Sequence, residues 1–174
     1  SAEEPLKANS FIIWRQGELD DFELKLEYRI SGGNSGIQYR SFERPSRQWS
    51  VGGYQADMEA GDTWSGALYG EHFRKILARR GQKTVITDDH RPRVVGSTGD
   101  SALLQSQIRK DDWNEYHIIA RGDHFTHKIN GHTMIECTDE DTAMRRRSGI
   151  LALQVHRGPP MKVQFRKIRL KRLK

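Results

Sequence analysis

Hydrophobic and polar residues alternate with a period of two along much of this chain. From Phe22 to Ile30 every second residue is apolar, and every residue between them is charged. The same alternation returns at 37–40 and, after Gly52-Gly53, at 54–59. Because successive side chains of a β-strand point to opposite faces of its sheet, each segment is predicted to be a strand with one buried face.

Turn signals predict a run of antiparallel strands between Trp113 and Cys137. Gly122-Asp123 and Asn130-Gly131 can supply the positive φ values that tight hairpins need. Three consecutive strands joined by these two turns are therefore expected.

The end of the chain carries two more strand patterns, separated by Gly158-Pro159-Pro160. They cover 149–156 and the segment from residue 161 onward. In the second one the apolar positions change phase between Phe165 and Ile168, as one inserted residue would cause. We expect a bulge near Arg166-Lys167.

The remaining segments show little helical periodicity. Residues 61–112 are rich in Gly, Asp, Thr and Arg and are expected to form long loops with short strands, and 139–147 has room for at most one short helix. Many strands without sustained helices predict an all-β sandwich or jelly roll, and a length of 174 residues suits one domain spanning 1–174.

Composition narrows the classes of partner. No apolar run approaches the length of about 20 residues that a membrane-spanning helix needs. Cys137 is the only cysteine, which excludes an intramolecular disulfide framework and a multi-cysteine zinc site. The net charge of +6 comes from basic residues spread among 23 acids, with dense groups only at 145–147 and 166–174. A solvated face explains these groups better than nucleic-acid binding, which ranks last among the functions considered.

Polar residues of varied chemistry occupy the outward positions of three predicted strands. Sugar hydroxyls pair with amide, guanidinium, carboxylate and imidazole groups alike, so one face bearing all four indicates a glycan-binding surface. The positions are Gln38 and Arg40, then Gln55, Asp57 and Glu59, then Gln154 and His156.

Asp57 and Glu59 have a spacing that permits acid–base chemistry. Residues two apart on a strand share a face and are about 6.6 Å apart at Cα, which is compatible with the carboxyl separations of roughly 5 to 9.5 Å found in glycosidases. For such a pair taken alone, two ordinary solvated strand residues are the more common explanation.

Histidines and aromatic residues supply the other candidates. His127 and His156 lie inside predicted strands, where an imidazole is a base, a metal ligand or a hydrogen-bonded core residue. Trp64 and Tyr69 lie in the loop-rich middle, where their rings could stack on a sugar, and Tyr54 adjoins Gln55.

Several short motifs, in order along the whole chain, resemble the 3-keto-disaccharide hydrolase family. The match continues to the end of the chain, although relatives commonly begin with an extra segment with a Phe-x-Gly…Gly-Trp pattern. The motifs that carry the resemblance are 33–40 (GNSGIQYR), 53–58 (GYQADM), 67–71 (ALYGE), 113–116 (WNEY), 127–131 (HKING), 153–158 (LQVHRG) and 165–170 (FRKIRL).

The resemblance implies a concanavalin A-like jelly roll of two antiparallel sheets, usually exported by bacteria to the periplasm or the exterior. It also implies cleavage of glycosides that were first oxidised to a ketone at carbon 3. Such a ketone acidifies the hydrogen on carbon 2, so that a base can eliminate the group at carbon 1 before water adds. A non-catalytic carbohydrate-binding module is the competing class, because sandwiches of this kind also bind glycans without cleaving them.

The expected catalytic residues are Asp57, His156, Arg40 and Glu71. His156 or Asp57 would be the base, and Arg40 or a bound divalent cation would stabilise the enolate. Glu71 or Tyr69 would donate the proton, although no spacing here is a recognised metal signature. The expected substrate-binding residues are Gln38, Tyr54, Gln55, Glu59, Trp64, Tyr69, His127 and Gln154, with an oligosaccharide or glycoside as the ligand.

Overall fold

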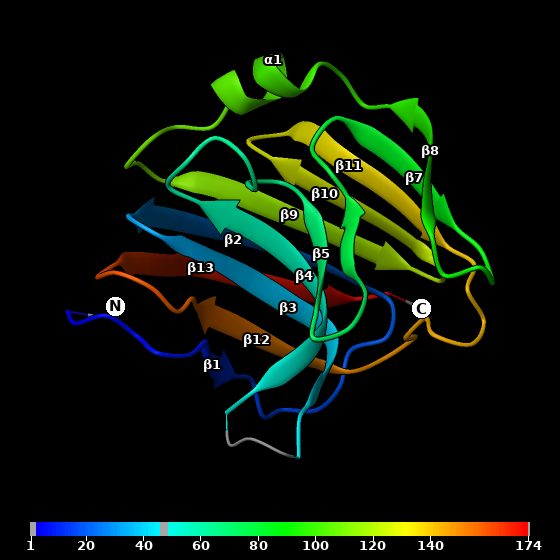
Figure 1. Ribbon diagram of the computed structural model, residues 1–174, viewed down its shortest axis with the longest axis horizontal. Helices are drawn as coiled ribbons and strands as arrows, with labels where there is room; N and C mark the ends of the chain where they lie inside the picture. Colours follow the sequence, from blue (N-terminus) through cyan, green and yellow to red (C-terminus); the bar gives the residue numbers. More distant parts are fainter. Residues whose placement is uncertain (1–2, 46–48, 174) are drawn as a thin grey trace.

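In the computed structural model of the protein, two β-sheets pack face to face (Figure 1). The structure describes residues 3–45 and 49–173, so Lys174 of the basic C-terminal group lies outside it. One sheet has the strand order β1-β12-β3-β4-β5-β6, and the other β13-β2-β9-β10-β11-β7-β8. The elements are β1 (Ser10–Ile13), β2 (Phe22–Ser31), β3 (Asn34–Glu43), β4 (Val51–Glu59), β5 (Leu68–Glu71), β6 (Lys75–Ala78), β7 (Gln82–Ile86), β8 (Pro92–Ser97), α1 (Ser101–Ser106), β9 (Asn114–Arg121), β10 (His124–Ile129), β11 (His132–Asp139), β12 (Ile150–Val155) and β13 (Lys162–Arg172).

The predicted strands are confirmed, and β2 shows why. Its buried and half-buried residues alternate without interruption from Phe22 to Ile30, so its apolar face lies in the core. β9, β10 and β11 form the expected antiparallel meander, with Asn130 and Gly131 both at positive φ in one of its turns. The expected bulge in β13 is present, with a register shift between Arg166 and Arg169 and a positive φ at Lys167.

Two features of the fold did not follow from the pattern. β7 pairs with β11 in parallel, whereas the other strand pairs are antiparallel. The segment before β9 contains the short helix α1, whose N-terminus is capped by Asp100 through hydrogen bonds from the backbone N–H groups of Ala102 and Leu103. Residues 139–147, by contrast, form strand end and turns without a helix.

β3 and β4 differ from the other strands because nearly all their residues are buried on both faces. One face carries Ile37, Tyr39, Tyr54, Ala56 and Met58 into the main core between the sheets. The opposite face carries polar residues, which are buried although they point away from the core. Burying polar groups costs free energy unless they are hydrogen-bonded, so this outer face must satisfy them locally.

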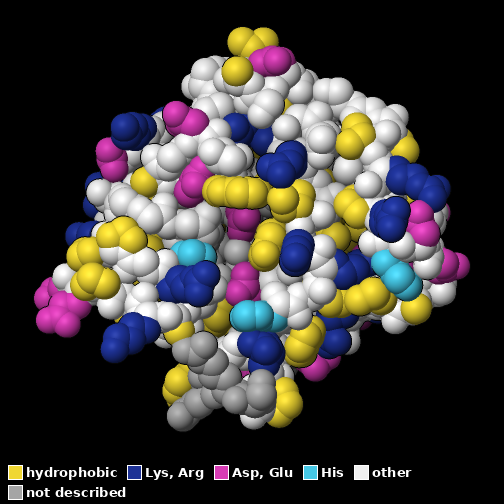
Figure 2. All heavy atoms as spheres, in the orientation of Figure 1, with side chains coloured by type: hydrophobic (Ala, Val, Ile, Leu, Met, Phe, Trp, Pro, Cys, Tyr) yellow, Lys and Arg dark blue, Asp and Glu magenta, His cyan; other side chains and the backbone are white. Residues whose placement is uncertain are grey.

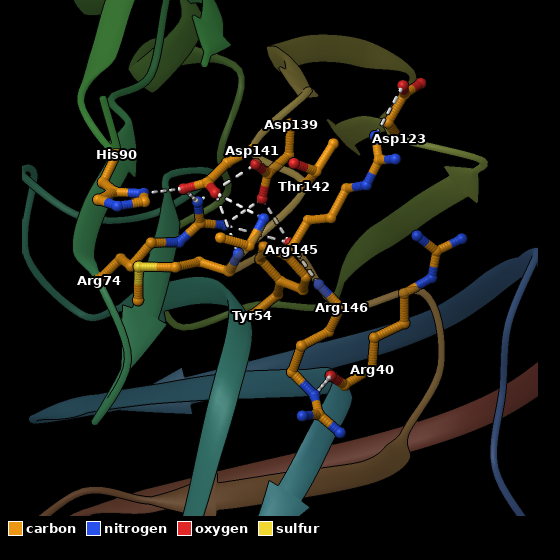
Figure 3. A network of polar contacts seen from close by, with 12 residues as sticks. Arg40, Tyr54, Arg74, His90, Asp123, Asp139, Asp141, Thr142, Arg145 and Arg146 are labelled. Carbon is orange, nitrogen blue, oxygen red and sulfur yellow. Dashed lines mark hydrogen bonds and ion pairs between the residues drawn. The ribbon is translucent and has the colours of Figure 1, made fainter. Parts of the chain in front are cut away.

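A buried ionic cluster links the two sheets at one end of the sandwich (Figure 3). Arg74, which follows β5, pairs with Asp139 and also with Asp141 at 3.2 Å. The hydroxyl of Tyr54 donates a 2.5 Å hydrogen bond to Asp139, and His90 Nδ1 lies 2.6 Å from Asp141. Both aspartates are fully buried, so these contacts fix the end of β11 against β4.

Candidate functional site

A groove of about 830 Å³ crosses the outer face of the six-stranded sheet. In Figure 2 this face has a hollow near its centre, where acidic side chains lie between basic, histidine and hydrophobic ones. Seven of the residues expected from the sequence line this groove, namely Gln55, Asp57, Glu59, Trp64, Tyr69, Glu71 and His156. Of the outward polar positions that the alternation predicted, Gln55, Asp57, Glu59 and His156 therefore share one cavity.

A chain of amide hydrogen bonds forms the floor of the groove. Gln38 Nε2 donates to Gln55 Oε1 at 2.5 Å, and Gln55 Nε2 donates to Asp57 Oδ1 at 2.6 Å. Ser41 Oγ donates to Gln38 Oε1 at 2.8 Å and so completes the chain. Gln38 itself is fully buried under the floor, where it orients Gln55 without lining the groove.

Gly36 makes room for this chain. It lies opposite Asp57 in the β3–β4 ladder, and the side chain of Gln55 lies over it. A Cβ at position 36 would come within 2.5 Å of Gln55 Cδ, closer than any real contact. A side chain here would push Gln55 away from Asp57.

Asp57 is the most perturbed carboxyl group of the groove. Its pKa is raised from an ordinary 3.8 to about 8, mainly by burial; the hydrogen bond from Gln55 lowers it, and the charges of Glu71 and Glu59 add to the rise. The side chain is only 5% exposed, although it borders the groove. At neutral pH the carboxyl group therefore carries a proton that it can donate.

Glu59 organises the loop that brings Trp64 to the groove. Its Oε1 accepts hydrogen bonds from the backbone N–H groups of Thr63 and Trp64, the latter at 2.6 Å. The guanidinium of Arg79 lies 5.3 Å from the centre of the indole ring. Glu59 thus positions an aromatic wall, which is a different role from that of an acid in a carboxylate pair.

Tyr69 and Glu71 form the wall contributed by β5. Glu71 Oε1 accepts a 2.9 Å hydrogen bond from Asn9 Nδ2 and lies 3.4 Å from His72 Nε2. Burial, followed by the charges of Glu71 and Asp57, raises the pKa of Tyr69. Its hydroxyl therefore keeps its proton and serves as a hydrogen-bond donor.

His156, directly after β12, contributes from the other side. Its Nδ1 lies 2.6 Å from the backbone carbonyl of Arg157. A carbonyl oxygen can only accept, so Nδ1 carries the hydrogen and Nε2 of the neutral ring is left as an acceptor. This tautomer suits a base.

Arg40 does not line the groove. A register shift between Tyr39 and Phe42, with a φ of 44° at Arg40, turns this side chain towards the other sheet. There it donates to the backbone carbonyls of Asp20 and Gly122 and pairs with Asp21 at 2.8 Å. The expectation that Arg40 stabilises an enolate therefore does not fit the structure.

Tyr54, His127 and Gln154 also lie outside the groove. Tyr54 belongs to the inward-pointing residues of β4, and His127 is fully buried with its Nε2 3.0 Å from the hydroxyl of Tyr39. Burial lowers the pKa of His127 to about 3, so it is a neutral core residue. Gln154 faces the same side as Gln55 but is covered where β12 pairs with β1, and its amide has no partner among the described residues.

Several groove residues were missed by sequence reasoning. They come from the N-terminal segment, from the residue before β4, from the turn after β5 with the start of β6, and from the segment after β12. They include Lys7, Asn9, Ser50, His72, Lys75 and Arg157. None lies on a strand whose alternation was visible in the sequence, so only the motifs around Glu71 and His156 could have pointed to some of them.

A divalent cation is not supported by a ligand set. Within residues 3–45 and 49–173, no three His, Cys, Asp or Glu side chains gather as metal ligands would. Likewise, the described part of the chain contains no helix of the length and apolar character needed to cross a membrane.

Residues 2–171 match the model of the 3-keto-alpha-glucoside-1,2-lyase-like domain. The chain belongs to this family. The match covers nearly the whole chain and confirms the resemblance that the ordered motifs predicted. No curated protein matches the sequence.

Solved structures similar to this lyase-like domain share its fold at low sequence identity. The carbohydrate-binding module CBM66 from Bacillus subtilis aligns with a TM-score of 0.58 and 15% identity over 94% of this chain and 82% of its own. A candidate glycosyl hydrolase from Parabacteroides distasonis gives 0.61 and 17% over 96% and 85%. A Bacillus subtilis protein of unknown function with a galectin-like fold gives 0.61 and 11% over 96% and 80%. The domain is thus an all-β sandwich with a galectin-like fold, which confirms the all-β jelly-roll sandwich that the sequence predicted.

Proposed function

We propose that the groove binds a glycoside whose sugar carries a ketone at carbon 3 and that it removes the group at carbon 1 by 1,2-elimination, followed by addition of water. The observation that carries this proposal is the buried, protonated carboxyl group of Asp57 in a groove that also presents an acceptor nitrogen of His156. An acid and a base facing one cavity are what an elimination requires. Membership of the lyase-like family agrees with this chemistry.

In this reaction His156 Nε2 removes the proton from carbon 2. The electron pair of that C–H bond forms a double bond between carbons 2 and 1, and the bond from carbon 1 to the aglycone oxygen breaks. Asp57 donates its proton to the departing oxygen, which leaves as a neutral alcohol. Water then adds to the double bond: its oxygen bonds to carbon 1, its released proton restores the carboxylic acid of Asp57, and the imidazolium of His156 returns its proton to carbon 2.

Tyr69 takes the role first expected of Arg40. Its hydroxyl remains protonated because its pKa is raised, and it donates a hydrogen bond to the ketone oxygen as negative charge develops there. Glu71 and Gln55 bind sugar hydroxyls, and the ring of Trp64 stacks on the sugar face. The amide chain from Gln38 keeps Gln55, and through it Asp57, in position.

A purely carbohydrate-binding role is the second candidate. It is favoured by the similarity in fold to the carbohydrate-binding module CBM66. The same groove would then bind a glycan through amides and aromatic rings without bond cleavage.

The two functions are distinguished by release of the aglycone. The protein is incubated with a 3-keto-glucoside and with the matching unoxidised glucoside, alongside the Asp57→Asn and His156→Gln variants. We expect release from the keto substrate alone, reduced at least about 100-fold in either variant. Binding of both glycosides without release from either would refute the elimination and support the binding module.

A further inference from the structure

The rim of the groove carries cations that its floor does not use. Lys7, Lys75 and Arg157 border the groove, are exposed, and form no ion pair with a carboxylate of the described residues. They come from both sides of the groove, since Lys7 and Arg157 lie beside β12 and Lys75 begins β6. Figure 2 shows basic side chains around the acidic hollow.

The simplest use of such cations would be direct ion pairs with the acids below them, but the hydrogen bonds of those acids go to other groups. Glu59 accepts hydrogen bonds from backbone N–H groups, and Glu71 accepts one from the amide of Asn9. Asp57 accepts one from the amide of Gln55. The three cations are therefore free to interact with a ligand that projects out of the groove.

We infer that the natural ligand carries a carboxylate on the part that projects from the groove, beyond the sugar that lies on the floor. This inference rests on the proposed function, in which the sugar ring meets Asp57 and His156; the group at carbon 1 would then project from the floor towards the rim. Cations around a concave site attract an anionic ligand and orient it, an effect that salt screens. The polar floor would bind the sugar, and the cations of the rim would bind the carboxylate of the aglycone.

The experiment uses two glucosides of equal shape, with 4-carboxyphenyl and 4-carbamoylphenyl aglycones, each in the unoxidised and in the 3-keto form. Calorimetry measures binding of the unoxidised pair, and aglycone release measures KM for the keto pair. We expect the carboxylate to bind about five- to tenfold more tightly than the carboxamide at low ionic strength, with most of this preference lost in 0.5 M salt.

Variants assign the preference to the rim. Lys75→Gln and Arg157→Gln are each expected to reduce the carboxylate preference about two- to fourfold and to leave carboxamide binding unchanged. Lys162→Gln, which removes the same charge from an exposed position on β13 of the other sheet, is the matched control and is expected to change neither.

The outcomes separate this inference from the proposed function. Release from both keto glucosides with equal KM and equal binding would overturn the inference and leave the elimination standing. A carboxylate preference in binding, without release from either keto substrate, would overturn the elimination and support an acidic ligand. A preference that persists in both rim variants would show that the rim does not recognise the charge.

Discussion

Replacing Asp57 by Asn is predicted to stabilise the protein at neutral pH and to slow the proposed elimination at least about 100-fold. The folded protein keeps this carboxyl group protonated up to a pKa of about 8, whereas an unfolded chain ionises it near 3.8. Each pKa unit is worth about 1.36 kcal/mol, so the penalty for the buried group is about 4 kcal/mol at pH 7 and about 6 kcal/mol above pH 8. Asn has nearly the same shape, can still accept the hydrogen bond from Gln55, and carries no such penalty.

The sign of the pH dependence follows from the raised pKa. Below about pH 4 the group is protonated in both the folded and the unfolded state, and it does not affect the pH dependence. Between about pH 4 and 8 only the unfolded state loses the proton, so the wild type loses stability as pH rises by up to about 1.4 kcal/mol per unit relative to Asp57→Asn.

Urea unfolding of both proteins at pH 5, 6, 7 and 8 measures this divergence. Asp89→Asn is the control, because hydrogen bonds, first from the backbone N–H of Arg91, hold the pKa of the exposed Asp89 carboxyl group below its usual value. Asp89→Asn should therefore gain no stability relative to the wild type as pH rises. Parallel stability curves for wild type and Asp57→Asn would refute the assignment of a protonated Asp57.

Three further predictions test the frame around the groove. Gly36→Ala should displace Gln55, because the new Cβ would collide with its side chain. We expect a loss of about 1–3 kcal/mol in urea unfolding and aglycone release slowed at least about tenfold. Unchanged kinetics would show that Gln55 does not position Asp57. Asp139→Asn removes the buried ion pair between Arg74 and Asp139, leaving Arg74 only Asp141, and should cost about 3–5 kcal/mol in thermal unfolding. A loss under about 1 kcal/mol would show that this cluster does not stabilise the fold. Arg40→Gln removes hydrogen bonds to two backbone carbonyls and should lower stability by about 2 kcal/mol or more, while KM and kcat stay within about twofold of wild type. A loss of kcat without a loss of stability would show that Arg40 takes part in the reaction.

The fold was predictable because its dominant physical signal is local. β2 buries every second residue against the other sheet, so its sequence alternates apolar with charged residues, and this alternation predicts the strand and its buried face. The parallel pairing of β7 with β11 could not be inferred in the same way. It depends on where a loop-rich segment docks, which short-range periodicity does not encode.

The floor of the groove was predictable for a related reason. Gln55 and Asp57 occupy outward positions of β4, and an alternating pattern states that they share a face. The pattern fails at Arg40, because a bulge at this residue breaks the period and directs its side chain into the sandwich. Neither composition nor periodicity predicts a positive φ at a non-glycine residue in the middle of a strand, so the direction of the Arg40 side chain could not be inferred.

The rim of the groove depends on contacts that span almost the whole chain. Leu6 exchanges backbone hydrogen bonds with Gly158, which brings the N-terminal segment beside the end of β12. Asn9 then accepts a hydrogen bond from the backbone N–H of Arg157 and donates one to Glu71, so a single amide joins both walls of the groove. Residues so far apart in sequence share no period, and only the docked chain brings them together. The floor that supplies the acid is thus local in origin, whereas the rim that would select the ligand is a product of tertiary structure.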